Sequence, residues 1–347
     1  MCETLLGPQS SENGQFRTST NLAPIAVSIG DPAGIGAEVV VKSWERRREE
    51  DLPPFFAVGD VAAIEAVWRG PLAVIGEPGD TFDYFDSALP VIRVAGSGVV
   101  PGEPTLDGAR NALDSLEFAV GLTRSGAAAA VVTGPVSKQQ LYAVGFTHPG
   151  QTEFVAERCG MSADGVAMML AGPTLKVVPV TGHIALADVQ ARLTTDRIVA
   201  KGRAAIRGLQ RQFGIAAPRL AVAGLNPHAG ENGALGREEI DIIQPAIERL
   251  VEEGYDVVGP MPPDIMFHDR KRRQYDVALC MYHDQALIPL KTLHFDDGIN
   301  ITLGLPIVRT SPDHGTAFDI AGKDVAVPGA MIAAIRIAGE CAARMAA

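Results

Sequence analysis

The feature that most constrains this chain is an alternation of short apolar runs with longer amphipathic segments, beginning at Pro24. The runs are rich in Val, Ile, Leu and Ala, and eight of them occupy residues 25–29, 55–58, 91–94, 129–132, 175–180, 220–223, 277–281 and 299–302. Because nearly every position in such a run is apolar, we expect strands that are covered by helices on both faces. The alternation therefore predicts an α/β layered fold.

A helix is predicted between two of these runs, over residues 196–213. Apolar side chains recur there at steps of three and four, at Ile198, Ala205, Ile206, Leu209 and Phe213. Thr194 or Thr195 is expected to cap the helix, and Gly214 to end it.

The length of the chain limits the number of domains that we expect, and its net charge limits the kinds of binding partner. A chain of 347 residues suggests about two domains at ~150 residues each. Neither a linker nor a repeat separates two halves, so we expect the chain to cross between the domains more than once. The formal charge is −11, and basic blocks such as residues 46–48 are short, which argues against a nucleic-acid partner.

Targeting signals and disulfides are not expected. No apolar run approaches the ~20 residues of a membrane helix, and the polar segment 1–22 resembles a disordered tail more than a signal peptide. The cytoplasm is the expected compartment. The cysteines are widely spaced and are expected to be reduced, mostly buried thiols: Cys2, Cys159, Cys280 and Cys341.

Three histidines follow predicted strands closely: His183, His228 and His283. Ligands of open α/β sheets bind beyond the carboxyl ends of the strands, so these rings could converge. Three neutral imidazoles with an open fourth position can hold a divalent ion that polarises a hydroxyl or carbonyl oxygen. Their spacing matches no local metal motif, and each ring could instead cap a loop. The residues alone leave both interpretations open.

Other strand-end residues suit an anionic ligand. Lys291, Asn300 and Arg309 could bind a phosphate or carboxylate, although solvated surface positions explain them equally well. The glycine-rich stretch 30–36 could meet an anion with its amides or simply form a tight turn. Lys138 is a candidate for proton transfer or anion binding.

Several longer motifs carry a family resemblance. They are GDPAGIGAE (30–38), TGPVSK (133–138), GLNPHAGE (224–231), MYHDQ (281–285) and NITLGLPIVRTSPDHGTAFDIAGK (300–323). With these motifs the chain resembles, from Ala26 to about Ala333, the 4-hydroxythreonine-4-phosphate dehydrogenases of vitamin B6 biosynthesis. The segment 313–323 is also similar to the dinucleotide loop of isocitrate and isopropylmalate dehydrogenases.

The resemblance implies a set of site residues. It implies a divalent metal (Zn, Mg or Co) on His183, His228 and His283. Substrate contacts are expected at Gln151, Thr152, Lys291, Asn300 and Arg309, and NAD or NADP contacts at Asp313, His314, Gly315, Thr316 and Asp319. The best-known members have histidine where this chain has Gln151, and glutamine can position a ligand but cannot titrate.

The resemblance also implies a two-domain architecture with the active site in the cleft. The first domain would comprise residues 23–146 and 296–347, and the second, residues 147–295, would carry metal ligands and dimer contacts. A homodimer would take metal-binding histidines from both subunits.

The implied reaction is an NAD(P)-dependent oxidation of a small phosphorylated amino acid, 4-phosphohydroxy-L-threonine. The resulting β-keto acid would lose carbon dioxide to give 3-amino-2-oxopropyl phosphate on the route to pyridoxine 5′-phosphate. Lys138 and Asp284 are the candidates for accepting the hydroxyl proton. Alternatives are a dehydrogenase of threonate or erythronate 4-phosphate or of a cis-diol, a zinc hydrolase or lyase without nucleotide, and a non-catalytic binding protein.

Overall fold

A single mixed sheet runs through the molecule. The computed structural model describes residues 22–94, 96 and 98–347, so the predicted tail lies outside the described residues apart from Leu22. The strands are β1 (Ile25–Ser28), β2 (Phe55–Gly59), β3 (Leu72–Val74), β4 (Leu89–Arg93), β5 (Ala130–Thr133), β6 (Ala167–Gly172), β7 (Leu175–Pro179), β8 (Arg219–Ala223), β9 (Asp256–Met261), β10 (Val277–Cys280), β11 (Ile299–Leu303) and β12 (Val308–Pro312). All eight predicted strands are present with ends within two residues of the predictions, whereas β3, β6, β9 and β12 were not predicted.

The α-helices in the described chain are α1 (Gly36–Glu45), α2 (Val61–Val67), α3 (Thr81–Tyr84), α4 (Leu106–Arg124), α5 (Lys138–Ala143), α6 (Gln151–Arg158), α7 (Val189–Arg192), α8 (Thr195–Phe213), α9 (Gln244–Glu252), α10 (Pro263–Met266), α11 (Asp269–Arg272), α12 (His283–Leu293) and α13 (Gly329–Ala346). Helix α8 confirms the helix prediction, because the Thr194 side chain accepts a hydrogen bond from Arg197 N and Gly214 ends the helix at φ 69°.

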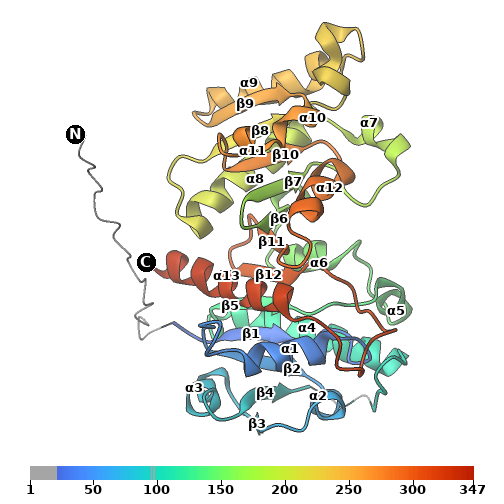
Figure 1. Cartoon of the computed structure of the whole chain (residues 1–347), viewed down its shortest axis with the longest axis vertical. Helices are drawn as coiled ribbons and strands as arrows, with labels where there is room; N and C mark the ends of the chain where they lie inside the picture. The colour runs from blue at the N-terminus through green and yellow to red at the C-terminus, as the bar shows by residue number, and fades with distance from the viewer. Residues whose placement is uncertain (1–21, 95, 97) are drawn as a thin grey trace, which may run out of the picture.

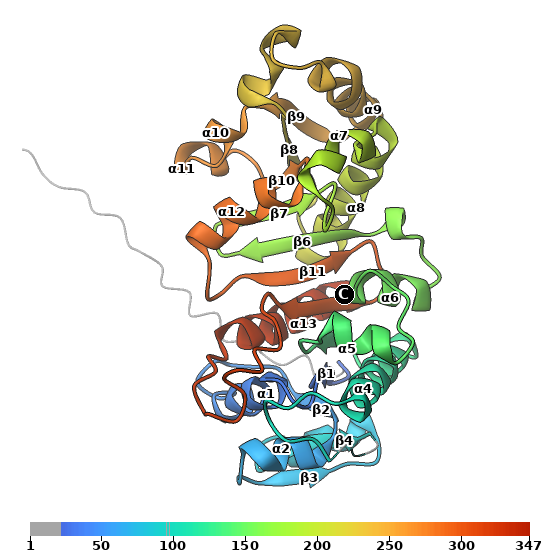
Figure 2. The ribbon, with the colours of Figure 1, turned by 90° about the vertical axis from the view of Figure 1, so that its right-hand side faces the viewer.

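The strand order is β3-β4-β2-β1-β5-β12-β11-β6-β7-β10-β8-β9. Six strands from β3 to β12 run parallel, as do the four from β7 to β9, and the pairs β12–β11, β11–β6 and β6–β7 are antiparallel. Three reversals of direction mean that the two parallel halves run in opposite directions. Figures 1 and 2 show these halves at the two ends of the molecule, with β11 and β6 between them. The chain leaves the first half after β5 and returns to it at β12.

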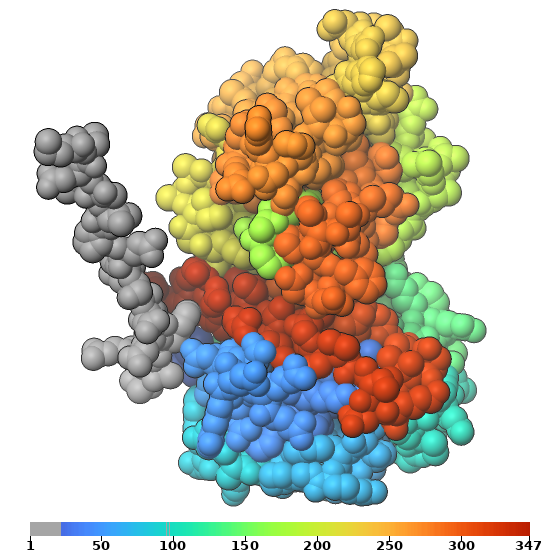
Figure 3. All heavy atoms as spheres, in the orientation of Figure 1, coloured from blue at the N-terminus to red at the C-terminus, as the bar shows by residue number. Residues whose placement is uncertain are grey.

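The two faces of the sheet are packed differently. On one face a continuous apolar cluster includes residues of α1, α8, α9 and α13 and extends through both halves. On the other face the apolar packing is divided into a cluster with α4 and α6 and a second cluster with α12. The interruption falls over β12 and β11. Figure 3 shows the C-terminal segment, in red, between the two halves at the surface.

The described cysteines confirm the expectation of free, mostly buried thiols. Cys280 and Cys341 are buried and Cys159 is partly buried, all without a disulfide, whereas Cys2 lies outside the described residues. In the described chain, no helix has the length and apolar character needed to cross a membrane.

Candidate active site

A cavity of about 520 Å³ lies where the second face of the sheet lacks an apolar cover. It is lined by residues of α5, α6, α7 and α8, by the segment after β7 and by the middle strands. Alternation along those strands explains its polarity, because successive side chains point to opposite faces. On β11 and β12, Ile301 and Val308 belong to the continuous core, while their neighbours Asn300 and Arg309 line the cavity.

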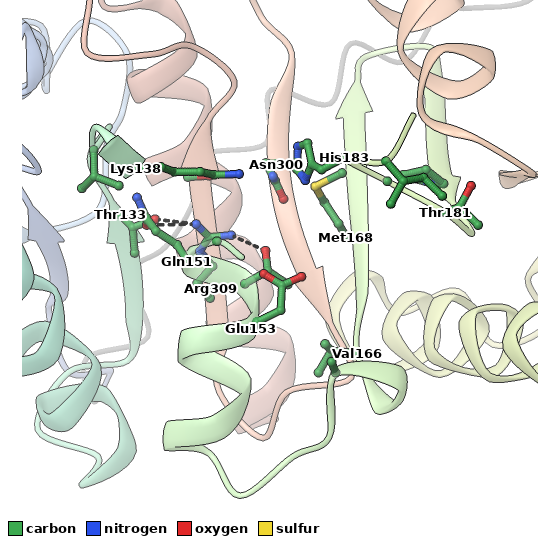
Figure 4. A pocket seen from close by; sticks show the side chains of 18 of the residues that line it. Thr133, Lys138, Gln151, Glu153, Val166, Met168, Thr181, His183, Asn300 and Arg309 are labelled. Atoms are coloured by element: carbon green, nitrogen blue, oxygen red, sulfur yellow. Dashed lines mark hydrogen bonds between the residues drawn. The ribbon is translucent and has the colours of Figure 1, made fainter. Parts of the chain in front are cut away.

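Arg309 is the most unusual residue of the site, since its side chain is buried and charged. Only 3% of the residue is exposed, and its guanidinium donates to Thr302 Oγ1 (3.0 Å), Thr133 Oγ1 (2.8 Å) and Gln151 Oε1 (3.2 Å), with Thr152 Oγ1 at 3.5 Å. All these acceptors are uncharged. Burial lowers the pKa of Arg309 to about 10, so the group remains protonated at neutral pH. Figure 4 shows its hydrogen bonds to other residues that line the cavity.

Two acceptor atoms at the cavity have no donor. Asn300 Oδ1 and His314 Nε2 are buried without a hydrogen-bond partner in the described structure. His314 Nδ1 lies 3.1 Å from the carbonyl oxygen of Gly315, which can only accept, so in the neutral ring the proton is on Nδ1 and Nε2 is an acceptor. Buried polar atoms are normally satisfied, so this cavity suits a ligand that brings N–H or O–H donors as well as negative charge.

Two of the three predicted metal-binding histidines lie together. The rings of His183 and His283 have centroids 5.5 Å apart, and β7 and β10, which precede them, are adjacent parallel strands. Burial lowers the pKa of His183, and the charges of Lys138 and His283 add to this, which favours the neutral ring that a metal requires. His283 Nδ1 lies 2.7 Å from Asp284 Oδ1, so the ring's Nε2 is left for another partner.

His228 does not join this pair. It belongs to a tight turn of left-handed residues after β8 (φ 53°), its side chain is 63% exposed, and its Nδ1 lies 2.5 Å from Glu231 Oε1. Among the described residues of this single chain, no three His, Cys, Asp or Glu side chains form a metal-binding group. The predicted three-histidine site is therefore not assembled within one chain.

The remaining predicted residues are divided between the cavity and its surroundings. Lys138 lines the cavity at the start of α5, where Ser137 caps the helix, and Figure 4 shows it pointing toward Asn300 and His183. Asp284 does not line the cavity, nor does Lys291, whose Nζ instead lies 2.9 Å from Asp313 Oδ2.

The predicted nucleotide loop packs on the glycine-rich turn after β1. Ile35 N donates to Thr316 O (2.9 Å), and a Cβ added at Gly34 would lie 2.8 Å from the same oxygen. The left-handed Gly30 (φ 74°) similarly meets Pro135 O, at 2.2 Å from an added Cβ. Close backbone packing thus accounts for these two glycines. Of the loop's predicted nucleotide contacts only His314 lines the cavity, whereas Gly315 and Asp319 are exposed.

Sequence reasoning missed part of the cavity wall. Glu153 lies in the same helical turn as Gln151 and Thr152, so its position beside two predicted residues was an available signal. The cationic residues from α7 and α8 lie in no recognised motif: Arg192, Arg197 and Lys201. Lys201 Nζ donates to the carbonyl oxygens of Ala163 (2.8 Å) and Val166 (2.5 Å), which attaches α8 to the cavity rim.

Comparison with known proteins places this chain in a family. The family model for the pyridoxal phosphate biosynthetic protein PdxA matches residues 54–338. A 4-hydroxythreonine-4-phosphate dehydrogenase from Zymomonas mobilis is 54% identical over 322 residues, covering 92% of this chain and 96% of the relative.

Solved structures agree with this match. The crystal structure of 4-hydroxythreonine-4-phosphate dehydrogenase from Klebsiella pneumoniae is 38% identical and aligns with a TM-score of 0.82, covering 92% of this chain and 99% of that one. A terephthalate 1,2-cis-dihydrodiol dehydrogenase from Burkholderia xenovorans is 33% identical with a TM-score of 0.64, covering 92% and 98%. The chain therefore belongs to the PdxA family of oxidoreductases, the 4-hydroxythreonine-4-phosphate dehydrogenases.

Proposed function

We propose that this protein oxidises the secondary hydroxyl of 4-phosphohydroxy-L-threonine with NAD or NADP. When bound, the nicotinamide would supply the hydride acceptor, and a basic group of the protein would accept the hydroxyl proton. The β-keto acid then loses carbon dioxide and leaves 3-amino-2-oxopropyl phosphate, in pyridoxine 5′-phosphate synthesis. The names of near full-length relatives support this substrate, and the site's chemistry supports it independently.

One observation carries the proposal: the buried charge of Arg309, held by uncharged acceptors at a cavity with two unfilled acceptor atoms. A ligand with an anionic end meets the charge, while ammonium and hydroxyl protons can meet Asn300 Oδ1 and His314 Nε2. A phosphorylated hydroxy amino acid has all of these groups. Thr152 would contribute its hydroxyl from α6.

The donor set also fits a divalent metal. We propose that His183 and His283 of one chain and His228 of a second copy hold Zn, Mg or Co in a homodimer. Two neighbouring rings, one favoured in its neutral form and one oriented by Asp284, are suitable ligands. When bound, such an ion lowers the pKa of a hydroxyl and polarises a carbonyl oxygen.

Lys138 is the proposed acceptor of the hydroxyl proton. Of the two candidates it is the one that lines the cavity, on the side of Asn300 and His183. Asp284 is better placed to orient the His283 ring. Lys291 is proposed to release Asp313 and contact the substrate when ligands bind.

The nucleotide is proposed to bind at the segment 313–319, with contacts from Asp313, His314, Gly315, Thr316 and Asp319. This segment follows β12, so it leaves the middle of the sheet beside the cavity. We propose domain boundaries that place residues 23–146 and 296–347 in one domain and residues 147–295 in the other.

The proposal is tested by following reduced nicotinamide near ~340 nm. We expect turnover of 4-phosphohydroxythreonine to exceed that of threonate 4-phosphate and of an aromatic cis-diol. Preference for the diol would favour the second candidate function, which the 33% identity to a cis-dihydrodiol dehydrogenase supports. Nucleotide-independent conversion would instead indicate a metal-dependent hydrolase or lyase.

A further inference from the structure

Gln151 has two hydrogen bonds that fix its amide group. Its Nε2 donates to Gly134 O (3.1 Å), and its Oε1 accepts from Arg309 Nη2 (3.2 Å). The carbonyl can only accept and the guanidinium can only donate. The position between them therefore requires a side chain that donates on one side and accepts on the other.

The remaining acceptors of Arg309 are three threonine hydroxyls. A hydroxyl that accepts from the guanidinium keeps its own proton for donation. Thr133 and Thr152 line the cavity, so their hydroxyls can donate to a bound oxygen atom while they contact the cation. The positive charge of Arg309 can therefore attract a bound anion directly, and the Thr133 and Thr152 hydroxyls that contact it can donate hydrogen bonds to the same anion.

We infer that Gln151 is a positioning residue that determines specificity for an oxyanion, because it orients the Arg309 guanidinium without cancelling its charge or titrating. A carboxylate at this position would neutralise the cation, and an imidazole would make the subsite respond to pH. The inference rests on the proposed function in taking the oxyanion to be one end of the substrate.

Other charged groups line the same cavity and contribute to any pH profile. They are Lys138 on α5, Glu153 on α6, Asp164 in the turn Ala163–Gly165, His183 after β7, Arg192 on α7, Arg197 and Lys201 on α8, and His314 after β12. All are unchanged in a Gln151 variant, so ratios of variant to wild type at each pH isolate the effect of position 151.

The charge is tested with Q151E, and Q139E is the matched control. Gln139 is an exposed glutamine on α5 that does not line the cavity, so it receives the same charge without the contact. Calorimetry of the full-length protein would measure the dissociation constants of sulfate and acetate. We expect Q151E to weaken binding of at least one anion by about tenfold or more, and Q139E to remain within about twofold.

The two anions identify which end of the substrate binds. A loss confined to sulfate assigns the subsite to a tetrahedral phosphate, and a loss confined to acetate assigns it to a carboxylate. Equal affinities in Q151E and wild type, or no binding of either anion to the wild type, would overturn the inference.

The neutrality of Gln151 is tested separately with Q151H. A neutral imidazole can donate and accept, so binding near about pH 8.5 should resemble that of the wild type. Toward about pH 6, anion binding should take up a proton at the introduced ring, so the affinity ratio of Q151H to wild type should rise about threefold or more. A ratio that stays constant would contradict the inference, and this arm decides the question if Q151E does not fold.

These measurements do not depend on turnover. If the dehydrogenase assay fails while both variants behave as expected, the proposed substrate is wrong and the oxyanion subsite stands. If the assay succeeds while Gln151 is without influence on anion binding, only the inference fails.

Discussion

The buried charge of Arg309 is unfavourable for folding but can attract an anionic ligand. Removing a charge from water is unfavourable, and here hydroxyl and amide acceptors offset that cost, with a weaker coulombic contribution from the Glu153 carboxylate. A carboxylate partner would improve stability but reduce the attraction for an anionic ligand. The lowered pKa of Arg309 reports this cost, since burial disfavours the charged form.

R309M should therefore separate activity from stability. The variant keeps an apolar chain of similar length but loses the charge, so kcat/KM for the phosphorylated substrate should fall by about a hundredfold or more. The melting temperature should change by only a few degrees, because relief of the buried charge is opposed by loss of the donors to Gln151, Thr133 and Thr302. Steady-state kinetics and thermal unfolding would check both. R336M is the control, since Arg336 is paired with Glu50 at the surface; retained activity in R309M would contradict the assignment.

Asp284 is expected to act through His283. D284N leaves the ring without its carboxylate partner, so metal affinity should fall by about 10- to 100-fold, measured by competition with a chelator. D297N is a matched control, because Asp297 lies 3.4 Å from a different histidine, His294, which does not line the cavity. Equal metal affinities in the two variants would contradict this role.

Among the elements, the loops that follow the strands of the first half pack against one another through closely spaced backbone atoms. The turn after β1 packs against the segment after β12 at Gly34 and against the segment after β5 at Gly30, because each glycine allows backbone atoms to approach closely. These segments are far from the turn in the chain, so the glycines are needed for tertiary contact rather than for the local turn alone. Only Gly30 of this pair has a left-handed backbone.

G34A tests whether this contact shapes the nucleotide site. The added methyl group would lie 2.8 Å from Thr316 O and must displace the segment 313–319. We expect the Kd for NAD or NADP to rise by about tenfold, with a change in unfolding free energy of about 1–3 kcal/mol. At Gly79 an added Cβ has no neighbour within 4 Å, so G79A should bind nucleotide like the wild type. Equal nucleotide affinity in G34A would place the cofactor elsewhere.

At the scale of the molecule, reversal of strand direction sets where ligands can bind. The parallel halves have opposite directions, and the antiparallel strands β11 and β6 join them where the apolar cover of one face is interrupted. His183 and His283 are adjacent because β7 and β10 are neighbours, while His228 lies on an exposed turn after β8. The proposed metal site would therefore take His228 from another copy.

Complementation between defective subunits tests this arrangement. H183A and H228A should each be inactive, but coexpression should restore up to about a quarter of wild-type activity, since half of random dimers contain one intact site of two. Coexpressed H183A and H283A form the control, because both changes affect the same side of every shared site. Absence of rescue in the first pair, or rescue in the second, would exclude a site shared in this way.

The sequence determined the local elements because burial on both faces leaves a continuous apolar run. This pattern identified eight strands and the limits of α8, and it placed His183 and His283 just after two of the strands. It could not identify β12, where polar residues such as Arg309 and Ser311 alternate with core positions and face the cavity.

The tertiary structure alone decided which side chains meet. The partners of Arg309 come from β5, α6 and β11, at positions as far as 176 residues away in the chain. Lys291 was expected at the substrate, yet it is paired with Asp313. The spacing of apolar residues along a segment indicates which of its faces are buried, because that spacing is a property of the segment itself. The charge beside a buried group depends on the packing of distant segments, which no local pattern specifies.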